Sequence, residues 1–600
     1  MHTSFASPSA GRHPEDWMLA LVLGMMALLP AAELLLRATF DTGVFGVAAI
    51  TQHLGLVVGM LGGAVAARQG QLLAASTLLF LLPPRLQAGA HRFAGLVAAA
   101  VCTVLAVAGA EFVFAERLAA KTLAYGVPVW VIELAMPAGF AWIGWRLIGA
   151  AAPGTGSRVV ALACGGLLAV IASFNGVLPR AAFAVTATGI AVAALLGAPL
   201  FAVVGGVALL LFWQAGEPLA SLAIDHYRTV VNPTLPALPL FTLAGYLLAE
   251  SRAPERLLTA CSACLGGFRY GPALAAITAS SLMTCLTGAS GVTILALGGL
   301  LLPLLLRSGF PERGALGLVT AAGLPGVLFA PSLPVILYAI VAEVDIREMF
   351  LGTLLPALLM AALTLVWGAR QRSLPAVACE PVPLRAALVG AKWELALPLI
   401  AIGPLFSGLA TPVEAAAITA VYAFVVEVVI HRDLRLTDLP RVFSECGLLV
   451  GGLLLILGVA LGLTGYLVDA GIPERLATWI QATVGGPLAF LLALNVVLLV
   501  AGCLVDIFSA TVVLAPLLVP IGHAFGLDPV HLGVVFLANL EIGYLTPPVG
   551  INLFFASSRF GKPLFEVHRS VVSLLPLLLA GLVAITYLPW LSLALPGLLR

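Results

Sequence analysis

Gly543–Pro548 (Gly-Tyr-Leu-Thr-Pro-Pro) interrupts a long apolar region, and this break indicates the kind of fold. Each proline lacks a backbone N–H and clashes with the carbonyl group one turn earlier, so a helix cannot continue through the segment. Inside a lipid bilayer, backbone freed in this way must face protein or water. We therefore expect a broken helix here, with its exposed peptide groups lining an internal site.

The break has a counterpart earlier in the chain, which predicts an internal repeat. Four pairs of segments occur in the same order, separated by between 216 and 220 positions: Phe241–Leu248 with Leu461–Val468, Pro254–Leu257 with Pro473–Leu476, Ile294–Leu304 with Val512–Ile521, and Ala330–Pro334 with Thr546–Gly550. The repeats would span about 181–370 and 390–600, joined by the polar connection Gly368–Glu394. We expect the second repeat to be inverted, the common arrangement in transporters.

Each repeat carries a pair of breaks that predicts a binding site. The first repeat has a Gly/Ser/Thr tip at Thr284–Ser290 and a break at Gly323–Ser332. The second has a tip at Gly502–Thr511, before Gly543–Pro548. Corresponding breaks in two halves point to a site at the bilayer midplane, where carbonyl groups can coordinate a cation and helix N-termini can face an anion. The alternative is that glycine and proline only kink helices for packing.

Two acidic residues, Asp506 and Glu541, lie in strongly apolar surroundings. A charge placed there costs at least about 2.5 kcal/mol on insertion scales, so such residues usually have a function. The functional interpretation is cation coordination or the lining of a hydrated cavity. The alternative is a carboxylate that caps a broken helix or pairs with a distant arginine.

Composition places the whole chain in a membrane. Of its 600 residues 61% are hydrophobic and 10% are charged, too few charges to cover a soluble surface. A formal net charge of +1 argues against a nucleic-acid partner. We expect four early spans of about 20 residues each, at Trp17–Leu36, Gly43–Ala67, Phe93–Phe114 and Pro128–Gly149. A fifth span is expected at Val159–Phe174. The first is expected to be a span and not a cleavable signal.

The sequence does not favour an enzyme or an ATP-driven pump. Gly288–Gly291 matches the G-x-S-G pattern of rhomboid serine proteases, but the later histidines, His431, His523 and His531, sit in polar or Gly/Pro-rich connections. A serine nucleophile needs a base within hydrogen-bonding reach. There is no G-x-x-x-x-G-K-[ST] loop for ATP. The one C-x-x-C, Cys261 and Cys264, has no second pair, so neither a metal site nor a disulfide framework is expected.

Four segments resemble signature segments of the large permease subunit of tripartite ATP-independent periplasmic (TRAP) transporters: Pro331–Tyr338, Thr411–Tyr422, Leu527–Gly533 and Leu545–Leu553. The resemblance covers about Ala181–Arg600. The first 150 residues, including Glu33–Arg37, resemble the four-helix small permease subunit. The chain therefore resembles a fusion, with a small-subunit-like domain at 1–157, a connecting transmembrane helix at 158–180 and a large-subunit-like transport domain at 181–600.

This resemblance implies an all-α, multi-pass protein of the bacterial inner membrane, with two re-entrant helical hairpins and an elevator mechanism. It implies import of a small organic acid, driven by a sodium gradient and dependent on a periplasmic substrate-binding protein. Sodium would be the coupling ion, and no other cofactor is expected. Two alternatives stay open: an anion carrier that needs no binding protein, and a proton-coupled version. The four-helix block argues against the first, because a stand-alone carrier has no need of a small subunit.

Motif matching places the candidate substrate- and ion-binding residues at the two tips and breaks: Thr287, Ser290, Thr293, Gly323, Pro331, Ser332, Gly502, Asp506, Ser509, Thr511, Glu541, Gly543, Thr546 and Pro547. The candidate sodium ligands among them are Ser290, Gly502, Asp506, Gly543 and Thr546. A hard cation prefers oxygen ligands of this kind. Val327, Ala330 and Ile507 stand where the family often has proline.

Overall fold

The computed structural model describes residues 13–74, 83–152, 154, 179–268, 270–371, 383–484 and 486–598. In these residues the regular structure is helical, with isolated β-bridges but no strand. Ten helices of the described part are long and apolar enough to cross a membrane, or up to 13 spans if each bent helix pair is one span. The prediction of an all-α polytopic membrane protein is confirmed.

The chain packs as two compact units, which are described separately. The N-terminal unit holds Ala6–Pro239 and Leu439–Pro473, and the hairpin unit holds Leu240–Asp438 and Glu474–Arg600. Packing therefore groups segments that are distant in sequence. The expected domain boundaries at 157 and 180 stay a prediction, and Val159–Phe174, the expected fifth span, lies outside the described residues.

The N-terminal unit contains the four early spans as predicted. Its helices are α1 (Pro14–Phe40), α2 (Val47–Gln69), α3 (Pro84–Ala119), the short η2 (Ala124–Gly126), α4 (Val129–Glu133), α5 (Ala135–Ala151), α7 (Arg180–Leu195), α8 (Leu200–Ala215), α9 (Ala220–Val230) and α21 (Leu439–Asp469). The fourth expected span is divided into α4 and α5. The helix α10 (Ala237–Ala249) begins at the edge of this unit.

Small residues let α2 and α21 approach closely inside the N-terminal unit. Gly447 and Gly451 are four residues apart on α21, and a Cβ atom added to Gly451 would lie 2.6 Å from the Cα of Gly62 on α2. Membrane helices lack a strong hydrophobic drive to associate, so close backbone contact of this small-xxx-small kind supplies packing energy. The long α21 is thereby held against the four-helix block.

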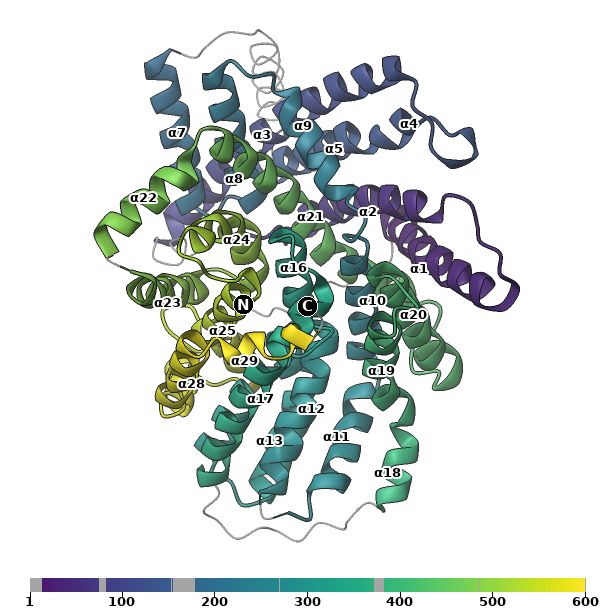
Figure 1. The fold of residues 1–600 in the computed structure, drawn as a ribbon, viewed down its shortest axis with the longest axis vertical. Helices are drawn as coiled ribbons and strands as arrows, with labels where there is room; N and C mark the ends of the chain where they lie inside the picture. Colours follow the sequence, from purple (N-terminus) through teal and green to yellow (C-terminus); the bar gives the residue numbers. More distant parts are fainter. Residues whose placement is uncertain are drawn as a thin grey trace. The chain divides into compact units, whose positions relative to one another are not determined.

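The hairpin unit repeats one order of elements, as the internal repeat predicts. The first copy runs α11 (Ala253–Leu265), α12 (Gly271–Thr287), α13 (Ser290–Arg307), α14 (Glu312–Ala321), α15 (Leu324–Leu328), α16 (Leu333–Val341) and α17 (Ile346–Gln371). The second runs α22 (Ile472–Val484), α23 (Pro487–Leu504), α24 (Ile507–Ala524), α25 (Pro529–Gly543), α26 (Ile551–Phe560), α27 (Leu564–Val571) and α28 (Leu575–Tyr587), followed by α29 (Trp590–Leu593) and η4 (Pro596–Leu598). Figure 1 shows α11, α12 and α13 as neighbouring helices. Each copy therefore has a helical hairpin followed by a broken helix.

Between the copies lie α18 (Leu384–Gly390), α19 (Lys392–Phe406), α20 (Pro412–Phe424) and the π-helical turn η3 (Val425–Ile430). The Thr-Pro-x-Glu signature starts α20 through a reciprocal cap. The Thr411 hydroxyl accepts a hydrogen bond from the Glu414 N–H at 3.3 Å, and the Glu414 carboxylate accepts one from the Thr411 N–H at 2.7 Å. Proline at the first helical position has no N–H to leave unpaired.

The connection expected at Gly368–Glu394 is partly helical. Gly368 is buried near the end of α17, and Leu384–Gly390 forms α18, in which good helix formers such as leucine, alanine and arginine predominate. Polarity predicted a connection, but local helix propensity decided its conformation.

Candidate functional site

The tip of the first hairpin is the turn Gly288-Ala289 between α12 and α13. Thr287 ends α12, and its hydroxyl donates back to the Met283 carbonyl at 2.9 Å. Within the hairpin, Thr284 and Thr293 share a hydrogen bond of 2.7 Å between their hydroxyl oxygens. A Cβ atom on Gly323 would lie 2.9 Å from the Thr284 hydroxyl, so the chain between α14 and α15 lies directly against the first hairpin. Thr293 and Gly323 thus both contact Thr284, while Thr287 lies at the end of the same helix, and the role of all three in binding stays a prediction.

Ser290 joins the first hairpin to the second broken helix. Its hydroxyl donates to the Asn552 Oδ1 at 3.1 Å, and both residues are buried. Gly291 meets the ring of Phe555 on the same helix, α26. The Asn552 Nδ2 has no hydrogen-bond partner among the described residues. Asn552 was not singled out in the sequence, although it lies within the signature Leu545–Leu553.

The second hairpin contacts its broken helix backbone to backbone. A Cβ atom on Gly543 would lie 2.6 Å from the Gly502 Cα, and one on Gly502 would lie 2.8 Å from the Leu540 Cα. No side chain fits at either position, because real Cβ contacts do not come this close. Helix α23 therefore lies against the end of α25 through two glycines, both of which the sequence placed at the site.

Asp506 is at the tip of the second hairpin and caps α24. Its Oδ1 accepts the Ser509 N–H at 2.9 Å, in the usual geometry of an N-cap. The side chain is half-buried. Thr511 donates to the Ile507 carbonyl at 2.6 Å, and the Tyr544 hydroxyl accepts the Ile507 N–H at 2.6 Å. Tyr544, which sequence reasoning missed, thus ties the tip to the break after α25.

Glu541 lies on α25, one turn before the break, and is fully buried. Neither of its carboxylate oxygens has a hydrogen-bond partner among the described residues. A buried carboxylate without partners is costly, which makes this the most unusual polar group of the predicted set. Pairing with a distant arginine, the alternative considered from the sequence, is not seen in the described part of the chain.

The other predicted residues lie at the two breaks but differ in exposure. Pro331 and Ser332 precede α16 and are buried, and the Ser332 hydroxyl has no partner among the described residues. The Ser509 hydroxyl is likewise buried without one. Thr546 is half-buried and donates to the Ile542 carbonyl at 3.0 Å, while Pro547 is exposed. The first break is therefore closed over by protein, and the second is open on one side.

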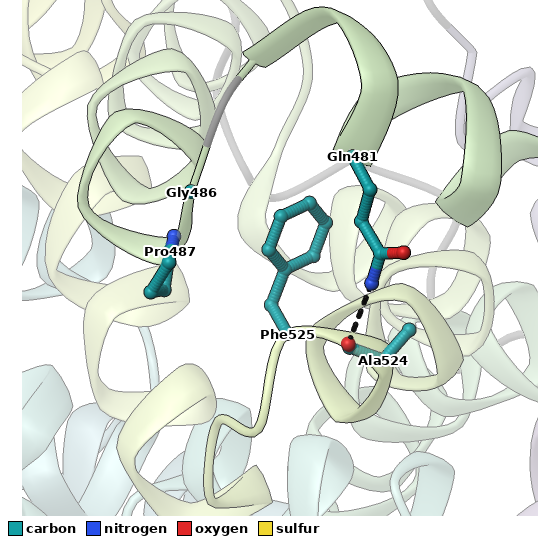
Figure 2. A pocket seen from close by; sticks show the side chains of 5 residues that line it. All are labelled: Gln481, Gly486, Pro487, Ala524 and Phe525. Carbon is teal, nitrogen blue, oxygen red and sulfur yellow. Dashed lines mark hydrogen bonds between the residues drawn. The ribbon is translucent and has the colours of Figure 1, made fainter.

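A pocket of about 380 Å³ lies at the base of the second hairpin, at the opposite end of α23 and α24 from Asp506. Figure 2 shows its lining residues, with the Gln481 amide donating to the Ala524 carbonyl at 2.8 Å. The Phe490 and Phe525 rings stack with centroids 4.4 Å apart. None of the predicted site residues lines this pocket, so we place the candidate site at the tips and not here.

Two histidines expected in connections lie inside helices. His523 is in the last turn of α24, and His531 is in the first turn of α25. His531 is buried, with Nδ1 2.7 Å from the Ser592 hydroxyl and Nε2 3.2 Å from the Thr586 carbonyl. The Ser290 hydroxyl is bonded to Asn552 and to neither histidine in the described part of the chain.

Comparison with protein families divides the chain as the motifs did. Residues 183–591 match the family model described as the DctM component of tripartite ATP-independent periplasmic transporters. Residues 26–154 match the model described as the DctQ component of the same transporters.

Individual relatives carry transporter names. The C4-dicarboxylate TRAP transporter large permease protein DctM of Pseudomonas aeruginosa is 37% identical over 66% of this chain and 92% of its own length. The isethionate TRAP transporter permease protein DctMQ of Oleidesulfovibrio alaskensis is 30% identical over 66% of this chain and 63% of its own. The ectoine/5-hydroxyectoine large permease UehC of Ruegeria pomeroyi is 28% identical over 61% and 86%. A solved structure, the YdaH transporter of Alcanivorax borkumensis, is similar with a TM-score of 0.45 and 16% identity over 63% of this chain and 88% of that one.

Proposed function

The chain belongs to the tripartite ATP-independent periplasmic transporters, as a multi-pass inner-membrane permease with DctQ and DctM regions in one polypeptide, and from this premise we propose that it imports a small organic acid. Import is driven by a sodium gradient and depends on a periplasmic substrate-binding protein. The permease works by an elevator mechanism, in which the site moves across the membrane with the helices that carry it.

The substrate class we propose is a four-carbon dicarboxylate or a related small anion. Three relatives at 37%, 32% and 32% identity are named as C4-dicarboxylate permeases. More distant relatives are named for isethionate and ectoine, which are also small and carry an acidic group. Half-helix N-termini at the two tips, those of α13 and α24, supply the positive dipole ends that favour an anion.

Two hydroxyls at the tips support the sodium assignment. Ser290 donates its one hydroxyl proton to Asn552, and Thr546 donates its own to the Ile542 carbonyl. A hydroxyl whose hydrogen already donates a hydrogen bond can offer only its oxygen lone pairs to a further partner, and a cation binds to such lone pairs. We propose that sodium is held by these oxygens together with Asp506 and the backbone carbonyls around Gly502 and Gly543.

The hydrogen bond between Ser290 and Asn552 is the observation that carries the proposal. It joins residues 262 positions apart and connects the tip of one repeat to the broken helix of the other. In an elevator mechanism the two hairpins must move together with the site, and a direct contact between the repeats at the tip meets this requirement. Packing of Gly291 on Phe555 strengthens the same contact.

The test is uptake of labelled dicarboxylates into proteoliposomes that contain the full chain, with and without an inward sodium gradient and the cognate periplasmic protein. Uptake that requires both supports the proposal. Uptake without the soluble protein would identify a stand-alone carrier. Uptake that needs the protein but ignores sodium would overturn the ion assignment and leave the binding-protein dependence standing.

A single substitution tests the site. Ser290→Ala removes one oxygen ligand, so we expect the sodium concentration for half-maximal uptake to rise severalfold. Ser308→Ala is the matched control, because Ser308 lies at the other end of α13 and its hydroxyl only donates to the Leu304 carbonyl at 2.8 Å. Equal sodium activation of Ser290→Ala and wild type would remove Ser290 from the ion site.

A further inference from the structure

Three carboxylates converge on one arginine at a place remote in sequence from the hairpin tips. Arg256 on α11 donates from Nε to Glu394 of α19, from Nη2 to Glu427 of η3 at 2.8 Å, and from Nη1 to Asp433 at 2.6 Å. We call these four residues, together with His431, the Arg256 cluster. Each of the three guanidinium nitrogens thus serves a different carboxylate, contributed by a different segment.

The cluster is unbalanced in charge and deeply buried. Glu394 and Glu427 have side-chain exposures of 0%, whereas Arg256 and Asp433 retain 18% and 13%. One guanidinium against three carboxylates leaves an excess of two negative charges if all are ionised. Burying even one uncompensated charge costs several kcal/mol, so groups in this position usually take up a proton.

Two carboxylate oxygens without hydrogen-bond partners indicate where the excess negative charge lies. Glu394 Oε2 and Glu427 Oε1 are both buried without a hydrogen-bond partner among the described residues. Asp433, in the loop after η3, is different: burial raises its pKa, but hydrogen bonds from the Arg256 side chain and the Arg252 N–H, and the charge of Arg256, bring the pKa below its ordinary value. Asp433 is therefore ionised and takes up the arginine charge. The excess negative charge of the cluster therefore lies on the two buried glutamates.

Among the described residues, no second lysine or arginine forms an ion pair with Glu394, Glu427 or Asp433. His431 Nε2 is 3.4 Å from Glu394 Oε1 and is charged only if protonated. Tyr422 of α20 donates its hydroxyl to the Trp393 carbonyl at 3.0 Å. Lys392 of α19 lies over the Trp393 ring, 4.8 Å from its centroid. The excess negative charge of the cluster must therefore be balanced by a mobile positive charge.

We propose that the Arg256 cluster is a proton-binding site, in which the buried carboxyl group of Glu427 carries a proton in the folded protein. The proton comes from bulk water, and the partial exposure of Arg256 and Asp433 means that the cluster is not fully enclosed by the described residues. A carboxylic O–H gives one buried oxygen a hydrogen to donate and reduces the negative excess by one.

The site lies at a junction that matters for the hairpins. Helix α11, which carries Arg256, packs on both helices of the first hairpin, α12 and α13, and also on α18 and α19. Glu394 and Glu427 belong to the segment that links the two repeats. Loss of this proton adds a buried negative charge beside an arginine that already faces two other carboxylates, and loosens α11 from this segment. Because the folded cluster binds a proton that the unfolded chain does not hold near neutral pH, stability falls as pH rises.

The first experiment follows thermal unfolding of the purified full chain between about pH 6 and about pH 8.5, a range that lies above ordinary carboxylate pKa values. We expect the wild-type Tm to fall by several degrees as pH rises. Glu427→Gln carries its hydrogen permanently, so its Tm should be nearly constant and at least equal to wild type at the alkaline end. His431→Gln should keep the wild-type slope. Glu312→Gln, at an exposed ion pair with Lys562, is the matched control.

The outcomes separate the possible proton carriers. A flat profile for His431→Gln would make the histidine the titrating group and overturn the proposal, as would a wild-type slope in Glu427→Gln. If Glu427→Gln fails to fold, infrared spectroscopy decides with Glu394→Gln, which removes one negative charge beside Glu427: the C=O stretching band of protonated carboxylic acids should lose the contribution of one group in the variant. A band unchanged by that substitution would overturn the assignment. None of these readouts depends on transport.

Discussion

Gly502 and Gly543 set how closely the second hairpin approaches its broken helix. The backbones touch there, and a methyl group on either residue would overlap main-chain atoms of the other helix. Overpacking of this kind is relieved only by moving a helix, since backbone cannot rotate away as a side chain does.

Gly543→Ala should therefore displace α23 from α25. The expected cost is about 1–3 kcal/mol of stability, with a strong reduction in uptake because the tip at Asp506 moves with α23. Gly403→Ala is the control: Gly403 is inside α19, and no atom lies within 4 Å of the position where its Cβ would be. Thermal unfolding and uptake should separate the two variants. Near-normal uptake by Gly543→Ala would show that the close contact is not required.

Asp506 combines two roles that substitutions can separate. Asparagine is as good an N-cap as aspartate, so Asp506→Asn should preserve α24 and remove only the charge. Asp506→Ala should lose the cap as well, at a cost of about 1 kcal/mol. If Asp506 contacts sodium, both variants weaken the sodium dependence of uptake, but only the alanine variant lowers the Tm. Wild-type sodium activation in Asp506→Asn would reduce the residue to a helix cap.

The sequence indicates single residues where the chemistry is local, and their role in binding stays a prediction. Glycine at 502 and 543 and the hydroxyl of Ser290 stand out because a break in an apolar run is visible in the sequence. Asn552 and Tyr544 could not be identified, because their roles depend on partners at Ser290 and Ile507, 262 and 37 residues away. Arg256 was visible only as part of a repeated landmark, Pro254–Leu257, and nothing in the sequence placed three carboxylates around it.

At the scale of elements, helix breaks occur near the prolines and glycines that predict them. The exact residues at which each break begins and ends are not given by those prolines and glycines. A break was expected at about Gly323–Ser332, and within this range α15 forms at Leu324–Leu328 before the bend of 40°. Proline is accepted in the first turn of a helix, so Pro325 starts α15 and does not prevent it.

Pro547→Ala tests whether the second break shapes the site. The substitution restores a backbone N–H in the open segment between α25 and α26, which favours helix where the site needs irregular backbone. We expect impaired uptake with little change in membrane insertion. Pro529→Ala is the comparison, because Pro529 is the first residue of α25, where a missing N–H costs nothing. Full uptake by Pro547→Ala would make the break a packing feature only.

At the scale of the whole molecule, the division by family and the division by packing differ. The DctQ match ends at residue 154, and the DctM match begins at residue 183. Yet α21, from the DctM region, belongs to the same compact unit as the four-helix block. The repeat was visible in the sequence because it recurs at a near-constant spacing. The grouping of α21 with the block was not, because it depends on contacts between segments nearly 400 residues apart.

A buried ion network holds this N-terminal unit together and allows a test of its cohesion. Arg68 of α2 pairs with Glu15 at 3.1 Å and with Asp16 at 2.6 Å, both on α1, and Glu15 also pairs with Arg146 of α5. Asp16 is fully buried and accepts the Ser444 hydroxyl of α21 at 2.7 Å. The network thus joins α1, α2 and α5 to α21, which comes from the DctM region.

Arg68→Ala should destabilise the full chain strongly, by about 3–5 kcal/mol, because Asp16 loses its ion pair while remaining buried. Lys121→Ala, at an ion pair with Glu116 where the lysine is 64% exposed, should change stability by no more than about 0.5 kcal/mol. Replacing both partners, Arg68→Leu with Asp16→Leu, should recover much of the loss, since the desolvation cost of the charges disappears with them. Tm measurements on the purified chain decide the matter. A double variant as unstable as Arg68→Ala would mean that the network supplies specific geometry and not only charge balance.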